Sequence, residues 1–249
     1  MFPEERVSVT GKKILIVQHM DWERPGGHLL AALTEASVNF DLAEVWHQPL
    51  PPLDPYAGMV VLGGSPNVDE EENFPYLKPL KAMIKENIAS GRSYLGFCLG
   101  HQLLSHVLGC RVGPMSQKSV GFATGHLTPR GQSHPAFQGL PVEFPLFKWH
   151  GQGVFMPVPH GLAILATSEA APVEAIGIID NPRVVGLQFD NHADAQDAAT
   201  WLAHDREWAL DGSGVDPEAL PSQAREREAE IGATFRPFMG NFFRIAGLI

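Results

Sequence analysis

The 249-residue sequence has little cysteine, few basic residues and no long hydrophobic run. Its 2 cysteines are too few for a disulfide framework, and 18 Lys and Arg against 28 Asp and Glu give a formal net charge of −10. Such an acidic surface repels phosphate backbones and anionic headgroups, so we expect no nucleic acid and no membrane as a partner. No apolar stretch approaches the roughly 18 residues that span a bilayer.

Residues 1–11 are charged and lack the apolar stretch of a signal peptide. We therefore expect a cytoplasmic protein with reduced cysteines. A length near 250 residues fits one large α/β domain or two small ones. We expect one domain over residues 1–210 and a helical C-terminal extension over residues 211–249, packed on the same domain because its phenylalanines need burial.

Short β-branched runs alternate with helical spacing in the first part of the chain. Residues 12–18 are typical of a strand buried on both faces, residues 28–36 of a helix, and residues 39–46 and 58–62 of two further strands. Strand, helix, strand is the pattern of a βαβ unit, and it predicts an α/β fold with parallel strands.

Periodicity changes after this unit. Leu77, Leu80, Ile84 and Ile88 recur at helical intervals, and a strand at residues 93–97 runs directly into a second helical pattern. Shorter strand-like stretches separated by Pro and Gly then follow, before a helix after Asn191 and a charged tail. These stretches are residues 120–127, 146–149, 163–167, 175–179 and 184–189.

Cys98 lies where the predicted strand turns into the helix, with Gly96 and Gly100 two residues to either side. This is the pattern of a nucleophile elbow with cysteine in place of serine, in which a Cβ on either glycine clashes with the neighbouring backbone. The helix N-terminus favours a thiolate, and the Leu99 N–H points toward a developing oxyanion. A buried core cysteine beside a tight turn is the alternative. Cys110 lacks these features, so we expect it in the core.

Residues 96–104, GFCLGHQLL, resemble the nucleophile segment of class I glutamine amidotransferases, in the stand-alone branch similar to the amidotransferase domain of GMP synthase. Residues 61–66 (VLGGSP) resemble the oxyanion-strand loop of that family, and residues 148–151 (KWHG) its substrate loop. Residues 185–189 (VGLQF) resemble the strand that delivers its catalytic histidine. The resemblance extends from about residue 12 to about residue 202.

The resemblance implies a three-layer sandwich with a mostly parallel central sheet and a reaction without a cofactor or metal. A Cys98 thiolate attacks the carboxamide of glutamine or a γ-glutamyl amide, which gives a thioester and ammonia. Gly64 and Leu99 form the oxyanion hole in this scheme. Water or another amine then resolves the thioester. The ammonia is either released by simple hydrolysis or passed to an acceptor on a separate synthetase. The residues implied in substrate binding are Gln102, His150, Gly151 and Gln152.

The sequence departs from the family after residue 189. The family has His-Pro-Glu there, the histidine as general base and the glutamate as its orienting partner, whereas this chain has Asp190, Asn191 and His192. A carboxylate with an ordinary pKa near 4 is a poor base for a thiol near 8.5, and its charge raises the thiol pKa. Gln152 also stands where relatives often carry Asp, which bears on recognition of the substrate ammonium.

Three interpretations of this departure stay open. In a swapped dyad, His192 approaches Cys98 while Asp190 orients its ring. In a second, His150, His101 or the helix dipole alone sustains a slow reaction. In a third, the fold persists as a catalytically impaired pseudoenzyme that binds a small molecule or a partner.

A metal site is a further alternative of another class. Asp190, His192 and Asp194 alternate along the chain and have the side chains that divalent metals bind. We instead interpret Asn191 and Asp194 as the N-cap and the first-turn acid of the next helix, and we predict no metal.

Overall fold

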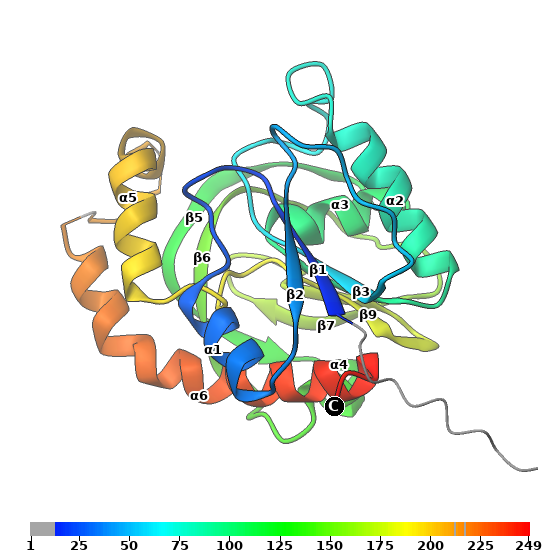
Figure 1. Ribbon diagram of the computed structural model, residues 1–249. Helices are drawn as coiled ribbons and strands as arrows, with labels where there is room; N and C mark the ends of the chain where they lie inside the picture. The colour runs from blue at the N-terminus through cyan, green and yellow to red at the C-terminus, as the bar shows by residue number, and fades with distance from the viewer. Residues whose placement is uncertain (1–12, 212, 217) are drawn as a thin grey trace, which may run out of the picture.

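A nine-stranded sheet lies between two layers of helices in the computed structural model, which describes residues 13–211, 213–216 and 218–249 (Figure 1). Lys12, where the first strand is expected to begin, and residues 1–11 lie outside the described residues. The elements in chain order are β1 (Lys13–Gln18), α1 (Gly27–Glu35), β2 (Phe40–Glu44), β3 (Tyr56–Val61), α2 (Leu77–Ala89), β4 (Ser93–Phe97), α3 (Leu99–Val107), β5 (Val112–Leu127), α4 (Pro129–Ser133), η1 (Pro135–Phe137), β6 (Glu143–Val154), β7 (Leu162–Ser168), β8 (Ala175–Ile178), β9 (Asn181–Leu187), α5 (Ala195–Leu210) and α6 (Leu220–Ala246).

The sheet has a parallel part and an antiparallel part. The strand order is β2-β1-β3-β4-β9-β8-β7-β5-β6. Neighbours from β2 to β9 pair in parallel, and the remaining neighbours pair antiparallel. Every residue of β3 and β4 is buried, as expected for strands covered on both faces. This arrangement confirms the predicted βαβ unit, and it aligns the carboxyl ends of β1, β3, β4 and β9 at one edge.

Alternate residues of the central strands pack against different helices. Ile14 and Ile16 of β1 join one hydrophobic cluster with α1 and α6, and Leu15 and Val17 join another with α2 and α3. Side chains alternate across a strand, so each strand contributes to both layers. The predicted three-layer α/β architecture is therefore confirmed.

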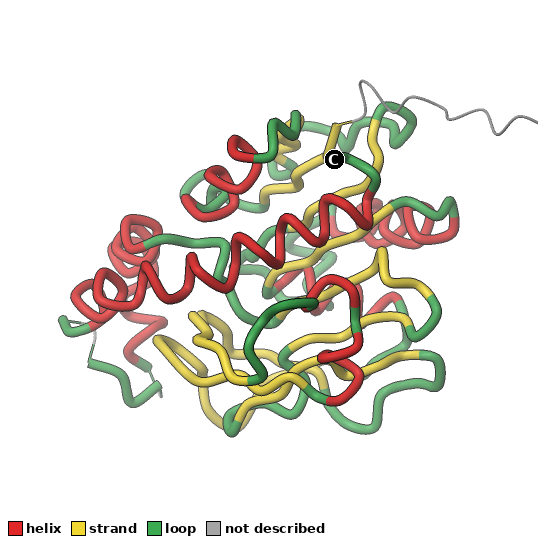
Figure 2. Tube along the Cα trace, turned by 90° about the horizontal axis from the view of Figure 1, so that it is seen from below, coloured by secondary structure: helices red, strands yellow, loops and turns green. Residues whose placement is uncertain are grey.

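The long helix α6 crosses the face of the sheet that α1 also covers (Figure 2). It contacts α1, β6 and β9 and buries an apolar row in their cluster, whereas its other face is charged. The division of the chain at residue 210 stays a prediction, and Gly212 and Pro217 of the expected extension lie outside the described residues. No described helix is long and apolar enough to cross a membrane. The buried phenylalanines of α6 are Phe235, Phe238, Phe242 and Phe243.

The structure corrects two expectations of local structure. The strand expected to begin at residue 120 begins at Val112. Gly113 and Pro114 interrupt the strand pattern in the sequence, but these residues still pair with β6, with a register shift after Pro114. The sequence predicts Asn191 as the N-cap of α5, but Asp194 is the N-cap, with a capping box to Asp197. The Asn191 side chain instead accepts from the Phe147 N–H at 2.8 Å.

Candidate active site

Cys98 joins β4 to α3 through a strained backbone turn. Its φ of 44° and ψ of −102° form a backbone conformation that residues with a side chain rarely adopt. Its N–H donates to the Leu187 carbonyl at 2.9 Å, which ties the turn to β9. The structure thus has the sharp strand-to-helix turn that the sequence predicts.

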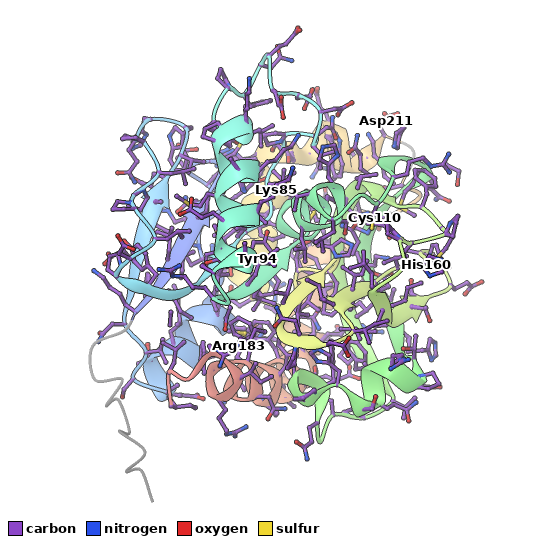
Figure 3. All side chains as sticks on the ribbon, turned by 90° about the vertical axis from the view of Figure 1, so that its right-hand side faces the viewer. Lys85, Tyr94, Cys110, His160, Arg183 and Asp211 are labelled. Carbon is purple, nitrogen blue, oxygen red and sulfur yellow. The ribbon has the colours of Figure 1, made fainter. Side chains whose placement is uncertain are left out.

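Two close backbone approaches explain the glycines around Cys98. A Cβ on Gly96 would lie 2.4 Å from the carbonyl carbon of Gly100, and one on Gly100 would lie 2.1 Å from the carbonyl oxygen of Val61. The hydroxyl of Tyr94, labelled in Figure 3, donates to the Gly100 carbonyl at 2.8 Å. The predicted clash at both glycines is confirmed, and β3, β4 and α3 meet here without room for a methyl group.

A cavity of about 160 Å³ opens beside Cys98 at the carboxyl edge of the parallel strands. It brings together all but one of the residues that the sequence predicts for the site. The exception is Leu99, which does not line it, but its N–H is the first of α3 and has no acceptor within the helix. The lining residues are Glu23, Gly63, Gly64, Ser65, Pro66, Asn67, Cys98, Gln102, Trp149, His150, Gly151, Gln152, Asp190, His192, Trp201, Asp205 and Trp208.

The predicted substrate-binding residues form one hydrogen-bonded group. The amide nitrogen of Gln102 donates to the Gln152 carbonyl at 3.0 Å and lies 3.4 Å from Oε1 of Gln188. Nδ1 of His150 lies 2.9 Å from the same Gln152 carbonyl. Burial lowers the pKa of His150 to about 3, so its ring is neutral and Nδ1 donates. Their binding role stays a prediction, but they form one wall of the cavity.

Asp190 and His192 differ in their surroundings. A Cβ on Gly63 would lie 3.4 Å from Oδ1 of Asp190 and 3.4 Å from Cβ of Cys98, so this carboxyl borders the same point as the cysteine. The ring of His192 stacks on Phe97 at 4.5 Å between centroids. Oδ1 of Asp190 and Nδ1 of His192 are 3.8 Å apart, too far for a hydrogen bond. The two side chains are neighbours in the cavity, but they do not form the hydrogen bond by which Asp190 would orient the ring in a swapped dyad.

Charge and burial together keep the Cys98 sulfur protonated. Burial raises the pKa of the thiol well above its ordinary value, and the charges of Asp190 and Glu23 raise it further. The Leu99 N–H acts in the opposite direction with a smaller effect. The sulfur donates to the Trp149 carbonyl at 3.6 Å. The expected resting thiolate is therefore wrong, because burial outweighs the helix N-terminus.

Neighbouring acids also raise the pKa of Asp190. Burial is the largest cause, followed by the charge of Glu23, whereas Lys148 lowers it. Lys148 is itself buried in an ion pair with Glu174. Burial lowers the pKa of His192 to about 3. The thiol and the His192 imidazole are thus uncharged at neutral pH.

The structure narrows the remaining alternatives. His101 is fully buried beside Gly186 and does not line the cavity, so of the two histidines named as substitute bases only His150 does. Asp194 uses its carboxylate to cap α5, which removes the third member of the suggested metal set. Within the described ranges no group of three or more His, Cys, Asp or Glu side chains is arranged to hold a metal ion.

Sequence reasoning missed two acids and the aromatic wall of the cavity. Glu23 follows the carboxyl end of β1, where a topological argument points, but it carries no motif. Asp205 lies inside α5 at a break in helical geometry, with φ −113° and ψ 25°. No pattern in the sequence marks that break. The aromatic wall consists of Trp149, Trp201 and Trp208.

Curated relatives are similar to part of this chain. A GMP synthase (glutamine-hydrolyzing) of Thermomicrobium roseum is 36% identical over 132 residues, which are 53% of this chain and 22% of the relative. A chain of Sulfolobus acidocaldarius, named as one of the subunits of a glutamine-hydrolyzing GMP synthase, is 36% identical over 95 residues, 38% of this chain and 48% of the relative. The chain thus spans less than half the length of either relative.

Solved structures match over nearly the whole chain. A glutamine amidotransferase of Thermotoga maritima has a TM-score of 0.82 at 24% identity, covering 95% of this chain and 98% of that one. At this identity the likeness shows the fold. The family model described as glutamine amidotransferase class-I matches residues 26–193, more than half of the chain and the whole stretch from α1 to His192. The chain therefore belongs to the class-I glutamine amidotransferase family.

Proposed function

We propose that this protein hydrolyses the side-chain amide of glutamine, or of a γ-glutamyl compound, through a thioester on Cys98. The observation that carries the proposal is the strained φ of 44° at Cys98, beside a cavity that holds the predicted substrate residues. Backbone strain of this kind persists where the surrounding structure maintains it, and it is common at nucleophiles. A cysteine with a purely structural role needs neither the strain nor the cavity.

The first step requires removal of the thiol proton. We assign this task to the pair of Asp190 and His192, which line the cavity with Cys98. Within the described residues, both carboxyl oxygens of Asp190 and Nδ1 of His192 have no hydrogen-bond partner. A buried carboxyl with a raised pKa is a stronger base, once ionised, than an ordinary one. The two groups titrate as a coupled pair, so the proton belongs to the pair.

The sulfur then forms a bond to the amide carbon, and the carbonyl oxygen becomes an oxyanion. The N–H groups of Gly64 and Leu99 stabilise that charge in this scheme. Collapse breaks the carbon–nitrogen bond, and the departing ammonia or amine takes the proton from the Asp190–His192 pair. Water then attacks the thioester, which releases the γ-carboxylate and restores the thiol.

Acyl-enzyme formation tests this proposal directly. Purified protein is incubated with glutamine or γ-glutamyl-p-nitroanilide, quenched in acid and analysed by intact mass and peptide mapping. We expect a γ-glutamyl group on Cys98, together with release of ammonia or p-nitroaniline. Cys98→Ala should show neither, and Cys110→Ser should show both. A wild-type protein that forms no adduct and releases no product contradicts the proposal.

A binding module without catalysis is the second candidate, and one observation favours it. The pKa of the thiol is raised by the acid that replaces the family histidine, which opposes nucleophilic attack. The variant that carries both Asp190→His and His192→Glu restores the order of the family. If it gains hydrolysis that the parent lacks while both bind glutamine equally, the protein is such a module.

A separate synthetase is the proposed partner where ammonia is not simply released. The Sulfolobus acidocaldarius relative is named as one part of a GMP synthase, which supports a role for this chain beside another chain. Co-purification of the tagged protein with a stable synthetase tests this. Ammonia accumulation at the same rate with and without cell extract favours hydrolysis alone.

A further inference from the structure

Two carboxyls in the cavity take no part in the chemistry proposed above. Glu23 and Asp205 line it together with Asp190, and none of the described lining residues is Lys or Arg. Three carboxyls that share one cavity without a cation in its described lining disfavour one another's ionised forms. The cavity therefore favours a positively charged ligand, because the part of its lining that the structure describes supplies no Lys or Arg.

Glu23 has one oxygen available for a ligand. It is 8% exposed, and its Oε1 accepts a hydrogen bond from the Ser65 hydroxyl at 3.2 Å. Its Oε2 is buried and, among the described residues, has no hydrogen-bond partner. Burial, then the charge of Asp205, raises the pKa of Glu23 to about 8. A cation that enters next to Oε2 replaces the missing partner and stabilises the carboxylate.

Asp205 reaches the same space from the other side. It is placed there by the break in α5, and burial raises its pKa. The loop that carries Glu23 packs on this part of α5, since the Trp22 ring stacks on His204 at 5.1 Å between centroids. The β1–α1 loop and α5 thus hold the two acids on either side of one pocket.

Aromatic rings form the rest of this end of the cavity. The Trp149 ring stacks on Trp208 at 6.2 Å and meets Trp201 edge-on at 6.0 Å between centroids. Trp208 already has the ammonium of Lys118 over its ring at 4.9 Å. Indole rings attract organic cations, and they also pack against alkyl chains. Acids and indoles together select an ammonium on a carbon chain over a hydrated metal ion.

We propose that Glu23, with Asp205, binds an ammonium group of the substrate against the tryptophan wall. The inference rests on the proposed function. Relatives often carry an Asp at the position of Gln152, and Glu23 supplies the acid for ammonium recognition that this chain lacks there. Two groups have this chemistry: the α-ammonium of the glutamyl moiety, and a terminal ammonium on the amine that leaves. Glu23 is the binding residue in either case, and the ligands decide between them.

Four compounds separate the two sources. They are N5-(4-aminobutyl)-L-glutamine, which has both ammonium groups, N5-butyl-L-glutamine, which has the α-ammonium alone, N-(4-aminobutyl)glutaramic acid, which has the terminal one alone, and N-butylglutaramic acid, which has neither. Binding is measured by calorimetry in Cys98→Ala, so that hydrolysis does not interfere. The compound without an ammonium should bind at least about ten-fold more weakly than the tightest of the others.

Variants then connect the discrimination to Glu23. In the Cys98→Ala background, Glu23→Gln should lose about ten-fold or more for the compounds whose ammonium is recognised, and little for N-butylglutaramic acid. Glu72→Gln, an exposed acid at the surface, is the matched control and should change nothing. The loss follows the α-ammonium or the terminal ammonium, which identifies the source.

Two outcomes overturn the inference. One is equal binding of all four compounds, and the other is an equal loss for all four in Glu23→Gln, which indicates a structural role. Failure of the proposed function gives a different result. In that case wild type forms no acyl-enzyme, while Cys98→Ala still binds the compounds with an ammonium more tightly and loses this preference in Glu23→Gln. A far-UV circular dichroism spectrum of Glu23→Gln that matches the parent's, with a cooperative melting transition, shows that the fold is intact.

Discussion

The two cysteines of the chain lie at opposite ends of α3, and only one of them is in a site. Cys98 precedes the helix and Cys110 follows it, and each is 6% exposed. Burial raises the pKa of both thiols, that of Cys110 to about 11. Cys110, which is labelled in Figure 3, packs in the hydrophobic cluster under α2 and α3.

The difference between the ends is backbone strain and unmet polar groups, not burial. Cys98 has a positive φ and a cavity with unpaired acids beside it, whereas Cys110 has neither. Burial by itself makes a thiol inert. A buried cysteine becomes a candidate nucleophile where the chain places it under strain against an open space.

The largest expected difference between the two ends is in catalysis. Cys98→Ser should lower the rate of γ-glutamyl amide hydrolysis by about 10³-fold or more, because the hydroxyl is a far weaker nucleophile here. Cys110→Ser should keep the rate within about two-fold, since Cys110 lies outside the cavity. Product release at saturating substrate measures both. Equal loss in the two variants breaks the comparison.

The glycines at the two ends should differ next. Gly100→Ala places a Cβ 2.1 Å from the Val61 carbonyl oxygen, so backbone must move, and we expect a loss of about 3 kcal/mol in the free energy of unfolding. Gly109 has φ 88° but open space, since a Cβ there would lie 3.8 Å from Pro159. Gly109→Ala should cost about 1 kcal/mol, from the left-handed backbone alone. Urea denaturation of both variants gives these values, and a smaller loss at Gly100 contradicts the tight elbow.

The acids of the cavity should give the site a pH dependence that the other end of α3 lacks. Glu23 has a pKa of about 8 in the folded state, above the roughly 4.3 of an unfolded chain, so the folded state binds its proton more tightly. Its contribution to stability is present below about pH 4 and is lost as the pH rises toward 8.

Glu23→Gln removes this contribution and isolates it from other groups. The unfolding free energy of the variant relative to wild type should rise by about 4 kcal/mol between about pH 4.5 and about pH 8.5. Glu72→Gln should show no such change. Denaturation at several pH values is the measurement, and parallel curves for Glu23→Gln and wild type are evidence against a buried, unpaired Glu23.

The smallest expected effect is on the thiol itself. Burial and then the charge of Asp190 raise the pKa of Cys98, so Asp190→Asn should move the pH midpoint of iodoacetamide labelling at Cys98 downward. The midpoint at Cys110 should stay the same, because burial is the cause there. Peptide mapping reports both sites in one sample. A labelling midpoint at Cys98 that moves to higher pH in Asp190→Asn would contradict the effect assigned to the Asp190 charge.

Local patterns in the sequence predict the elbow and the layers of the fold well. The glycines at 96 and 100, the strand before them and the helix after them describe a turn that neighbours in the chain specify. The loop at Gly64 and the end of β9 at Asp190 follow parallel strands, so their convergence on Cys98 follows from topology. The start of β5 could not be predicted, because Gly113 and Pro114 are unfavourable in strands and only their pairing with β6 keeps this part of the chain extended.

The sequence by itself determined the position of Cys98, the buried strands around it and the replacement of the family histidine by Asp190, because each depends on residues adjacent in the chain. Only the tertiary structure decided the charge of the site. Glu23 and Asp205 are far apart in sequence, and they meet because the β1–α1 loop packs on the broken helix α5. Burial in that shared cavity, a property of the whole fold, then keeps the thiol protonated and leaves Oε2 of Glu23 without a hydrogen-bond partner among the described residues.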